Sequence, residues 1–263
     1  MNPNKFLLFI TRLAKKPGTV LLFILFPLMA DAQLNMRDST VSFAIFGASG
    51  AYQTPGGDLA KRFGDDMNVG MVFSWKLKSN WMLGIEGLFL FGGKVKEDQL
   101  LDNISTSQGA FIAGSGEYAN LLYSERGFKT EFKLGKIFPW IGPNPNSGVF
   151  FQAGCGLLQH KIKIQSQGFD VPSIRGEYLK GYDRLTNGLS ITEFIGYINF
   201  GNKRLVNFYA GPEFTQAFTQ NRRSFNFDTR ERDNSKRLDL LFGIRFVWMI
   251  PVYKRQPQAY YYN

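Results

Sequence analysis

The sequence is poor in two residues on which much protein chemistry depends. It contains one cysteine, Cys155, and one histidine, His160. A single cysteine excludes an internal disulfide. One cysteine with one histidine also excludes a zinc site of the usual composition, and no spaced Asp/Asn/Gly loop of the calcium-binding kind is present. We therefore expect no metal and no cofactor.

Long apolar runs are missing as well. The N-terminus has a basic part (Lys5, Arg12, Lys15 and Lys16), a short apolar run at 20–29, and the small-x-small sequence Ala30-Asp31-Ala32, which together predict a cleaved signal peptide at residues 1–32. Pro27 and the short run argue against a retained helix, and no later run reaches the length that a transmembrane helix needs. Cleavage would remove a net charge of +3 from the chain's +10 and leave +7.

Aromatic residues, by contrast, are abundant at 16% of the chain, with 26 phenylalanines. Many occur in segments where apolar and polar residues alternate, the pattern of a strand with two different faces. The clearest segment is 238–250, where Leu238, Phe242 and Phe246 alternate with Asp239 and Arg245. Similar segments are 67–76, 81–91, 128–134 and 206–214, with weaker ones at 41–52, 149–161 and 185–199.

The connectors between these segments alternate between long and short. The long ones are 53–66, 94–120, 165–184 and 219–237, and the short ones are 77–80, 139–147 and 200–204. Short periplasmic turns with long outer loops are typical of outer-membrane barrels. We therefore predict an all-β fold, an eight-stranded antiparallel up-and-down transmembrane barrel at residues 33–253. An even strand count puts both termini in the periplasm, with a tail at 254–263.

The four tryptophans favour the same topology. Trp75, Trp81, Trp140 and Trp248 all fall near short connectors or at the end of the last strand. Tryptophan prefers the membrane–water interface because its ring is apolar and its N–H needs a wet partner. We interpret the four as an aromatic girdle at the periplasmic rim.

With its signal peptide, eight strands, alternating connectors and final Phe-Gly-Ile-Arg-Phe-Val-Trp segment (242–248), the chain resembles the small outer-membrane barrels grouped as OmpX-, OmpW- or PorT-like. The resemblance spans the mature chain and is architectural. It implies a bacterial outer-membrane location but no single function, because adhesion, structural and secretion-accessory proteins share this fold. The chain departs from these families in continuing past its last strand, to Tyr260-Tyr261-Tyr262-Asn263.

Alternation points a set of charged side chains into the barrel lumen. They are Lys76, Glu86, Lys129, Glu131, Lys133, Glu193, Glu213, Asp239 and Arg245. An eight-stranded barrel is only wide enough for side chains to fill, and charges there must pair, because an unpaired buried charge is costly. We expect a salt-bridged plug; the alternative is a path for a substrate or protons.

His160 raises the possibility of a lipid A-modifying enzyme, since some eight-stranded barrels use a histidine beside a serine and an acid. In the deacylase type a serine follows the histidine by two residues on the same face, but here that position is Ile162. No other residue supplies a convincing partner, so we expect no catalytic residue and no enzyme.

The fourth long loop is rich in arginine and points to lipopolysaccharide. Its candidates for contact with lipid phosphates are Arg222, Arg223, Arg230 and Arg232, because arginine binds phosphate in a bidentate manner. A plain solvated loop explains the same charges. Nucleic acid is excluded by the compartment.

Three functions remain open at this stage. We favour a non-enzymatic barrel that is envelope-structural or an accessory subunit of a larger outer-membrane complex for transport, secretion or assembly. The alternatives are a lipid A-modifying enzyme and a narrow channel for small solutes. Expected partners are outer-membrane lipid, lipopolysaccharide and other outer-membrane or periplasmic proteins. Tyr260, Tyr261 and Tyr262 are candidates for docking such a partner, because tyrosine suits interfaces.

Overall fold

The computed structural model describes residues 39–168, 170–201 and 206–253. Two expectations lie outside these residues: the signal peptide at 1–32 and the tail at 254–263 with its three tyrosines. Among the described residues no helix is long and apolar enough to cross a membrane.

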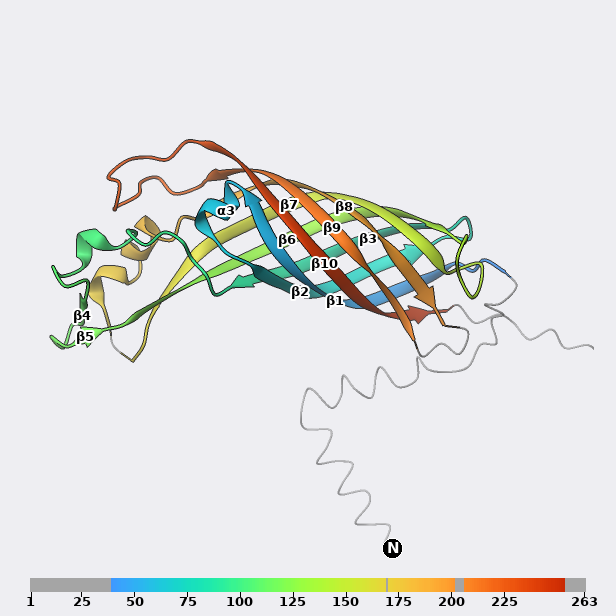
Figure 1. The fold of residues 1–263 in the computed structure, drawn as a ribbon, viewed down its shortest axis with the longest axis horizontal. Helices are drawn as coiled ribbons and strands as arrows, with labels where there is room; N and C mark the ends of the chain where they lie inside the picture. The colour runs from blue at the N-terminus through green and yellow to red at the C-terminus, as the bar shows by residue number, and fades with distance from the viewer. Residues whose placement is uncertain (1–38, 169, 202–205, 254–263) are drawn as a thin grey trace, which may run out of the picture. The chain divides into compact units, whose positions relative to one another are not determined.

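Eight antiparallel strands close into a barrel (Figure 1), as the alternation predicted. Around the ring the order is β1-β10-β9-β8-β7-β6-β3-β2, so each strand pairs with its neighbours in sequence and β1 closes on β10. The strands are β1 (Phe43–Gly57), β2 (Asp66–Lys76), β3 (Trp81–Gly92), β6 (Leu121–Phe138), β7 (Gly148–Ser166), β8 (Thr186–Phe200), β9 (Asn207–Asn221) and β10 (Lys236–Val252). The eight predicted segments match them one for one. Several strands are longer than predicted, since β6 begins at Leu121 and β7 continues to Ser166.

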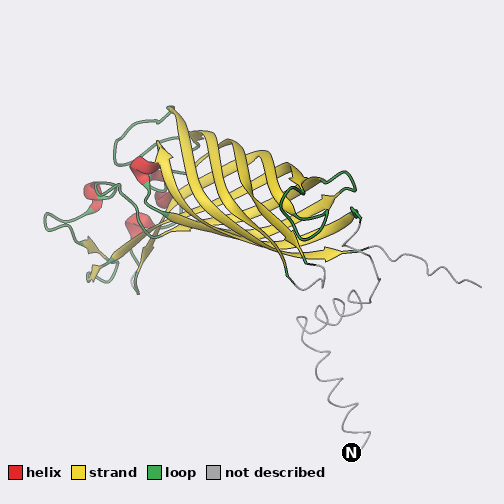
Figure 2. Cartoon of the chain, turned by 45° about the vertical axis from the view of Figure 1, so that its right-hand side comes forward, coloured by secondary structure: helices red, strands yellow, loops and turns green. Residues whose placement is uncertain are grey.

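The connectors divide the barrel into two ends. The turn end carries the short connectors after β2, β6 and β8, and the loop end carries the long ones. The small elements of the long connectors, drawn at the loop end in Figure 2, are α3 (Leu59–Arg62), the 3-10 helices η2 (Asp102–Ile104), η3 (Pro172–Ile174) and η4 (Tyr178–Gly181), and a two-stranded sheet of β4 (Phe111–Ile112) and β5 (Tyr118–Ala119).

Each strand has one buried and one exposed face, and the exposed face is apolar. Successive side chains alternate across the sheet, and the burial of β2 and β10 follows that alternation over most of their length. Large apolar side chains exposed on the wall include Phe46, Met71, Phe73, Leu83, Ile85, Phe89, Phe132, Leu134, Phe151, Leu157, Leu189, Ile191, Ile195, Phe218, Phe242, Ile244 and Phe246. A surface this apolar is unusual for a protein in water.

The interior is filled in layers. Toward the turn end the rings of Phe150, Phe194 and Tyr209 lie 5.3–5.9 Å from one another between centroids. At the loop end Leu59 and Phe63 fold inward with Leu158 and Ile162 into an apolar core that continues among the loops. These aromatic side chains therefore fill the lumen on both sides of its polar middle.

Candidate functional site: the charged lumen

Eight of the nine charged side chains predicted for the lumen are buried inside the barrel. These are Lys76, Glu86, Lys129, Glu131, Lys133, Glu213, Asp239 and Arg245. Six of them, three acids and three bases, form one cluster, the central cluster: Glu86, Lys129, Glu131, Lys133, Glu213 and Arg245. Lys76 and Asp239 lie apart from it.

Arg245 organises the central cluster from β10. Its Nε lies 2.5 Å from Oε2 of Glu213 and its Nη2 donates to Oε1 of the same carboxylate at 2.6 Å. Its Nη1 donates to Ser49 Oγ at 2.7 Å and lies 3.4 Å from Oε2 of Glu86. The guanidinium therefore holds Glu213 through one charge-assisted hydrogen bond from Nη2 and a second close ion-pair contact at Nε.

The two lysines complete the network from β6. Lys133 Nζ lies 2.8 Å from Oε1 of Glu86 and 3.2 Å from Oε2 of Glu213. Lys129 Nζ lies 3.3 Å from Oε1 of Glu213 and 3.4 Å from Oε2 of Glu131. Each carboxylate thus faces at least one cation, and the cluster is neutral, which is the condition for keeping six charges out of water.

Glycines on neighbouring strands make room for these long side chains. Lys133 pairs across the ladders with Gly84 on one side and Gly154 on the other. A Cβ at Gly154 would come within 2.9 Å of Lys133 Cγ. Arg245 likewise pairs with Gly211. A glycine directly across the ladder from an inward charge is therefore characteristic of this cluster. The pattern can be recognised in the sequence only after the strand register is known.

Lys76 closes the turn end rather than joining the central cluster. Its Nζ donates to Asn146 Oδ1 at 2.9 Å and to the backbone oxygen of Val41 at 3.1 Å. It also lies 5.6 Å from the ring centroid of Phe43. Because Asn146 belongs to the connector between β6 and β7, that connector folds beneath the barrel.

His160 and Asp239 form a separate pair nearer the loop end. Nε2 of His160 lies 2.9 Å from Oδ2 of Asp239, which also accepts a hydrogen bond from Thr219 Oγ1. The edge-to-face contact of Phe63 covers the imidazole, with the ring centroids 5.6 Å apart. A serine nucleophile beside His160, which acyl-transfer chemistry would need, is not among its contacts in the described chain.

Ion pairs also tie the loops across the mouth. Glu97, after β3, lies 2.5 Å from Arg62 Nε and 3.0 Å from Arg184 Nε, and Arg184 also pairs with Asp228. Burial alone would raise the pKa of Glu97, but the charges of Arg62 and Arg184 outweigh it and hold the pKa below its ordinary value. These pairs join all four long connectors, the first of them through Arg62 of α3.

Two further carboxylates, those of Asp66 and Glu125, are buried in the structure but were not predicted from the sequence. Asp66 begins β2 and Glu125 lies in β6, and each pairs across a ladder with Gly92. The predicted connector 53–66 includes Asp66, and the predicted segment 128–134 begins after Glu125, so neither carboxylate was predicted to be lumenal. In the described parts of the chain, no group of three or more His, Cys, Asp or Glu side chains is arranged to hold a metal ion.

Glu193 contradicts its predicted place. Thr192 and Phe194 are buried, whereas Glu193 is exposed on the outer wall. The pleat fixes the face of every residue in a strand, and Glu193 shares its face with Leu189, Ile191 and Ile195. The negative charge of Glu193 therefore does not bring its side chain into the lumen, because its position in the strand places it on the outer face.

The arginines of the fourth loop differ in whether their side chains are held by hydrogen bonds to other residues. Arg223 is engaged by both oxygens of Asp183, and Arg222 Nε donates to the side chain of Asn187. Arg230 and Arg232 are exposed. A phosphate would meet Arg230 and Arg232 more readily than Arg223; contact with lipopolysaccharide itself stays a prediction.

All four tryptophans lie at the turn end. Trp75 precedes the last residue of β2, Trp81 begins β3, Trp140 lies in the connector after β6, and Trp248 pairs with Phe208 near the start of β9. Trp81, Trp140 and Trp248 are exposed. Their common level agrees with a girdle, and its membrane role stays a prediction.

Comparisons with known proteins concern the fold. No family model matches the sequence, and no curated protein does. Among solved structures, Neisserial surface protein A is similar at 8% identity with a TM-score of 0.40, over 79% of this chain and 98% of that one. Ail, the attachment invasion locus protein of Yersinia pestis, is similar at 10% identity with a TM-score of 0.40, over 78% of this chain and 97% of that one. The outer membrane protein OprG from Pseudomonas aeruginosa is similar at 13% identity with a TM-score of 0.37, over 81% of this chain and 98% of that one.

Proposed function

We propose that this chain is a non-enzymatic integral barrel of the bacterial outer membrane that acts through its outer surfaces. In this role it is an envelope-structural protein or an accessory subunit of a larger complex. The observation that carries the proposal is the combination of an apolar outer wall with a filled lumen whose central cluster is charge-neutral.

The wall supports the membrane location. A β-strand crosses a bilayer with about 9–11 residues, and the barrel strands have 11 to 19. A closed barrel leaves no strand edge to be exposed to lipid. The polar side chains that a soluble barrel would show on this surface are inside instead, and the six charges of the central cluster pair with one another there.

The lumen favours a non-channel role. The central cluster crosses the interior, and Phe150 and Tyr209 fill the space on its turn side. Phe63 packs over His160 in the apolar core at the loop end. A solute path would have to break buried ion pairs. The same packing disfavours lipid-modifying chemistry at His160, because an imidazole that is 1% exposed and covered by Phe63 offers no access to a lipid.

The test combines location, folding and conductance. The chain should fractionate with outer membranes and migrate differently in gels when heated. The purified barrel should give no stable conductance in planar bilayers. Recovery from the soluble fraction would reject the membrane role, and a steady open channel in the unmodified protein would replace it with the channel function.

A further inference from the structure

The outer wall of β8 carries a carboxylate where lipid is expected. Glu193 is the eighth of the fifteen residues of β8, so it lies at the middle of the strand. Its side chain is exposed and has no ion pair or hydrogen bond with the residues that the structure describes. Ionisable groups at membrane depth are costly and usually serve a purpose.

Glu193 lies in a groove of the wall rather than on a smooth surface. This wall groove is a hollow of about 910 Å³ whose lining includes Leu134, Phe151, Ala153, Glu193, Pro212 and Phe242. Ala153 pairs directly with Glu193 across the β7–β8 ladder. Its small side chain leaves the carboxylate accessible between larger apolar neighbours.

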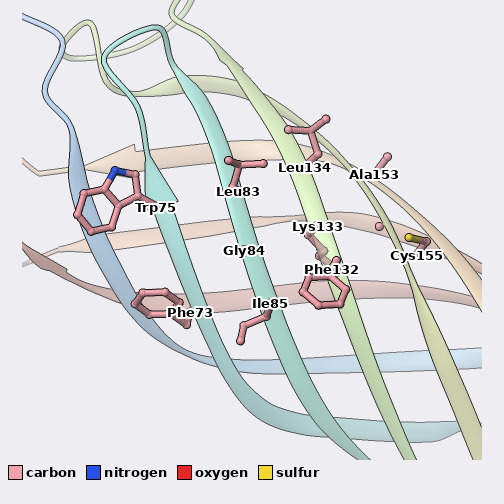
Figure 3. A pocket seen from close by; sticks show the side chains of 11 residues that line it. Phe73, Trp75, Leu83, Gly84, Ile85, Phe132, Lys133, Leu134, Ala153 and Cys155 are labelled. Carbon is pink, nitrogen blue, oxygen red and sulfur yellow. The ribbon is translucent and has the colours of Figure 1, made fainter.

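A second hollow adjoins the first and shares Leu134 and Ala153 with it. Figure 3 shows this neighbouring hollow, where Trp75, Leu83, Leu134 and Cys155 lie on the outer side of β2, β3, β6 and β7. Gly84 and Gly154, the glycines that flank Lys133, form part of its lining. The depression therefore extends across several strands, on a scale suited to a protein segment.

The ladder is interrupted at the same place. The β8–β9 register runs from Phe194 opposite Glu213 to Tyr197 opposite Ala210, with no pairs between. The interruption includes Pro212, which has no N–H to donate and normally belongs at a sheet edge or bulge. In lipid such a break is unfavourable, because no water supplies the missing donor. Glu193 and the break together make this part of the wall rich in acceptors and poor in donors.

Lys136 lines the same groove but does not form an ion pair with Glu193. Its Nζ donates to the backbone oxygen of Ser79 at 2.6 Å and lies 5.0 Å from the Trp81 ring centroid, at the turn-end rim.

The charge of Glu193 also decides among the possible occupants of the groove. A second copy of the chain, docked across a two-fold axis, would bring two Glu193 carboxylates toward each other. Lipid tails carry no donor at all. The remaining occupant is a protein segment with a cationic side chain.

We propose that the wall groove docks a membrane-spanning segment of a different protein, one that places a lysine or arginine against Glu193. Apolar packing fills the groove, and the charge pair fixes depth and register, as polar pairs do between membrane segments. This inference rests on the proposed membrane location and names the surface through which an accessory subunit would act.

Cys155 provides the probe. It is the only cysteine of the chain, it is exposed on the wall, and it lies two residues from Ala153 on the same strand. A benzophenone attached to Cys155 in native outer membranes is irradiated, and mass spectrometry identifies the adduct and the crosslinked peptide. We expect a peptide from a membrane-spanning segment that contains lysine or arginine. Glu193→Leu should lower the adduct yield at least tenfold, and Met71→Leu, on the exposed wall of β2 outside both hollows, should leave it unchanged.

A charge exchange decides the assignment. Glu193→Lys should abolish the adduct, and replacing the partner's cation with glutamate should restore it. Adducts with lipid alone, a dimer of this chain, a yield that Glu193→Leu does not change, or an exchange that fails to restore the adduct would each overturn the docking proposal. Heat-modifiable migration and membrane fractionation of the same samples separate the two proposals. A barrel that is folded in the outer membrane but forms no such adduct removes only the docking partner, whereas a chain absent from that membrane removes the proposed function as well.

Discussion

Two glutamates one step apart on the β8–β9 ladder have opposite environments. Glu213 pairs with Phe194 and points inward, and Glu193 pairs with Phe214 and points outward. Glu213 lies within ion-pair distance of Lys129, Lys133 and Arg245, whereas Glu193 has no cation within that distance in the described chain. The first carboxylate is part of a completed interior, and the second is consistent with a surface completed by another molecule.

The sharpest way to break this contrast is to unpair the interior. Arg245→Ala leaves Glu213 and Glu86 facing only the lysines, so the central cluster becomes net negative while buried. We expect a loss of about 3–5 kcal/mol in the free energy of unfolding, measured by urea titration in vesicles. Ile244→Ala, on the lipid face of the same strand, is the matched control and should cost less.

The double variant Arg245→Met, Glu213→Gln tests whether charge balance is the cause. It leaves two acids, Glu86 and Glu131, with two bases, Lys129 and Lys133. We expect it to be more stable than Arg245→Ala, since no unpaired charge remains. Equal or lower stability of the double variant would show that packing around Arg245, rather than its charge, holds the lumen together.

The second prediction concerns the wall. For the isolated barrel in vesicles, Glu193→Leu should raise the free energy of unfolding by about 1–2 kcal/mol, because a carboxylate leaves the lipid face. The reverse change on the same face, Ile191→Glu, should lower it by a similar amount. A loss of stability in Glu193→Leu would mean that Glu193 already has a stabilising partner within its own barrel.

The third prediction concerns acid pH at the mouth. Because its folded pKa is lowered, ionised Glu97 contributes stability that is complete above its ordinary value of 4.5 and is lost as pH falls through the lowered value. The protection factors of α3 and the neighbouring loops, which are corrected for the intrinsic pH dependence of exchange, should therefore fall below about pH 4.5. Glu97→Gln should exchange faster at neutral pH and respond less to acid, with an effect below about 1 kcal/mol, as befits a partly exposed pair.

The smallest expected effect is at His160. His160→Ala should leave the acylation of lipid A unchanged in the host, as read by mass spectrometry of the extracted lipid. Loss of one acyl product in this variant, but not in Phe63→Leu, would revive the enzyme hypothesis.

The sequence by itself determined the barrel. A period of two residues predicts strands with one apolar face, and the alternation of long and short connectors favours an up-and-down membrane barrel over a soluble sandwich. For that reason the strand segments and eight of the nine lumenal charges were found in advance. The error at Glu193 lies in one of the weaker alternating segments, 185–199, where Ile191 and Ile195 on the same face as Glu193 indicated the outward side.

The tertiary structure alone decided which charges meet. Arg245 and Glu213 lie on adjacent strands, but Arg245 also lies near Glu86, 159 positions away in sequence, because the strands are tilted and staggered around a narrow ring. Alternation assigns a side chain to a face, yet it carries no information about depth relative to distant strands. Closure of the ring sets that depth, and with it the neutral central cluster, the packing of Phe63 over His160, and the position of Glu193 in a groove of the wall.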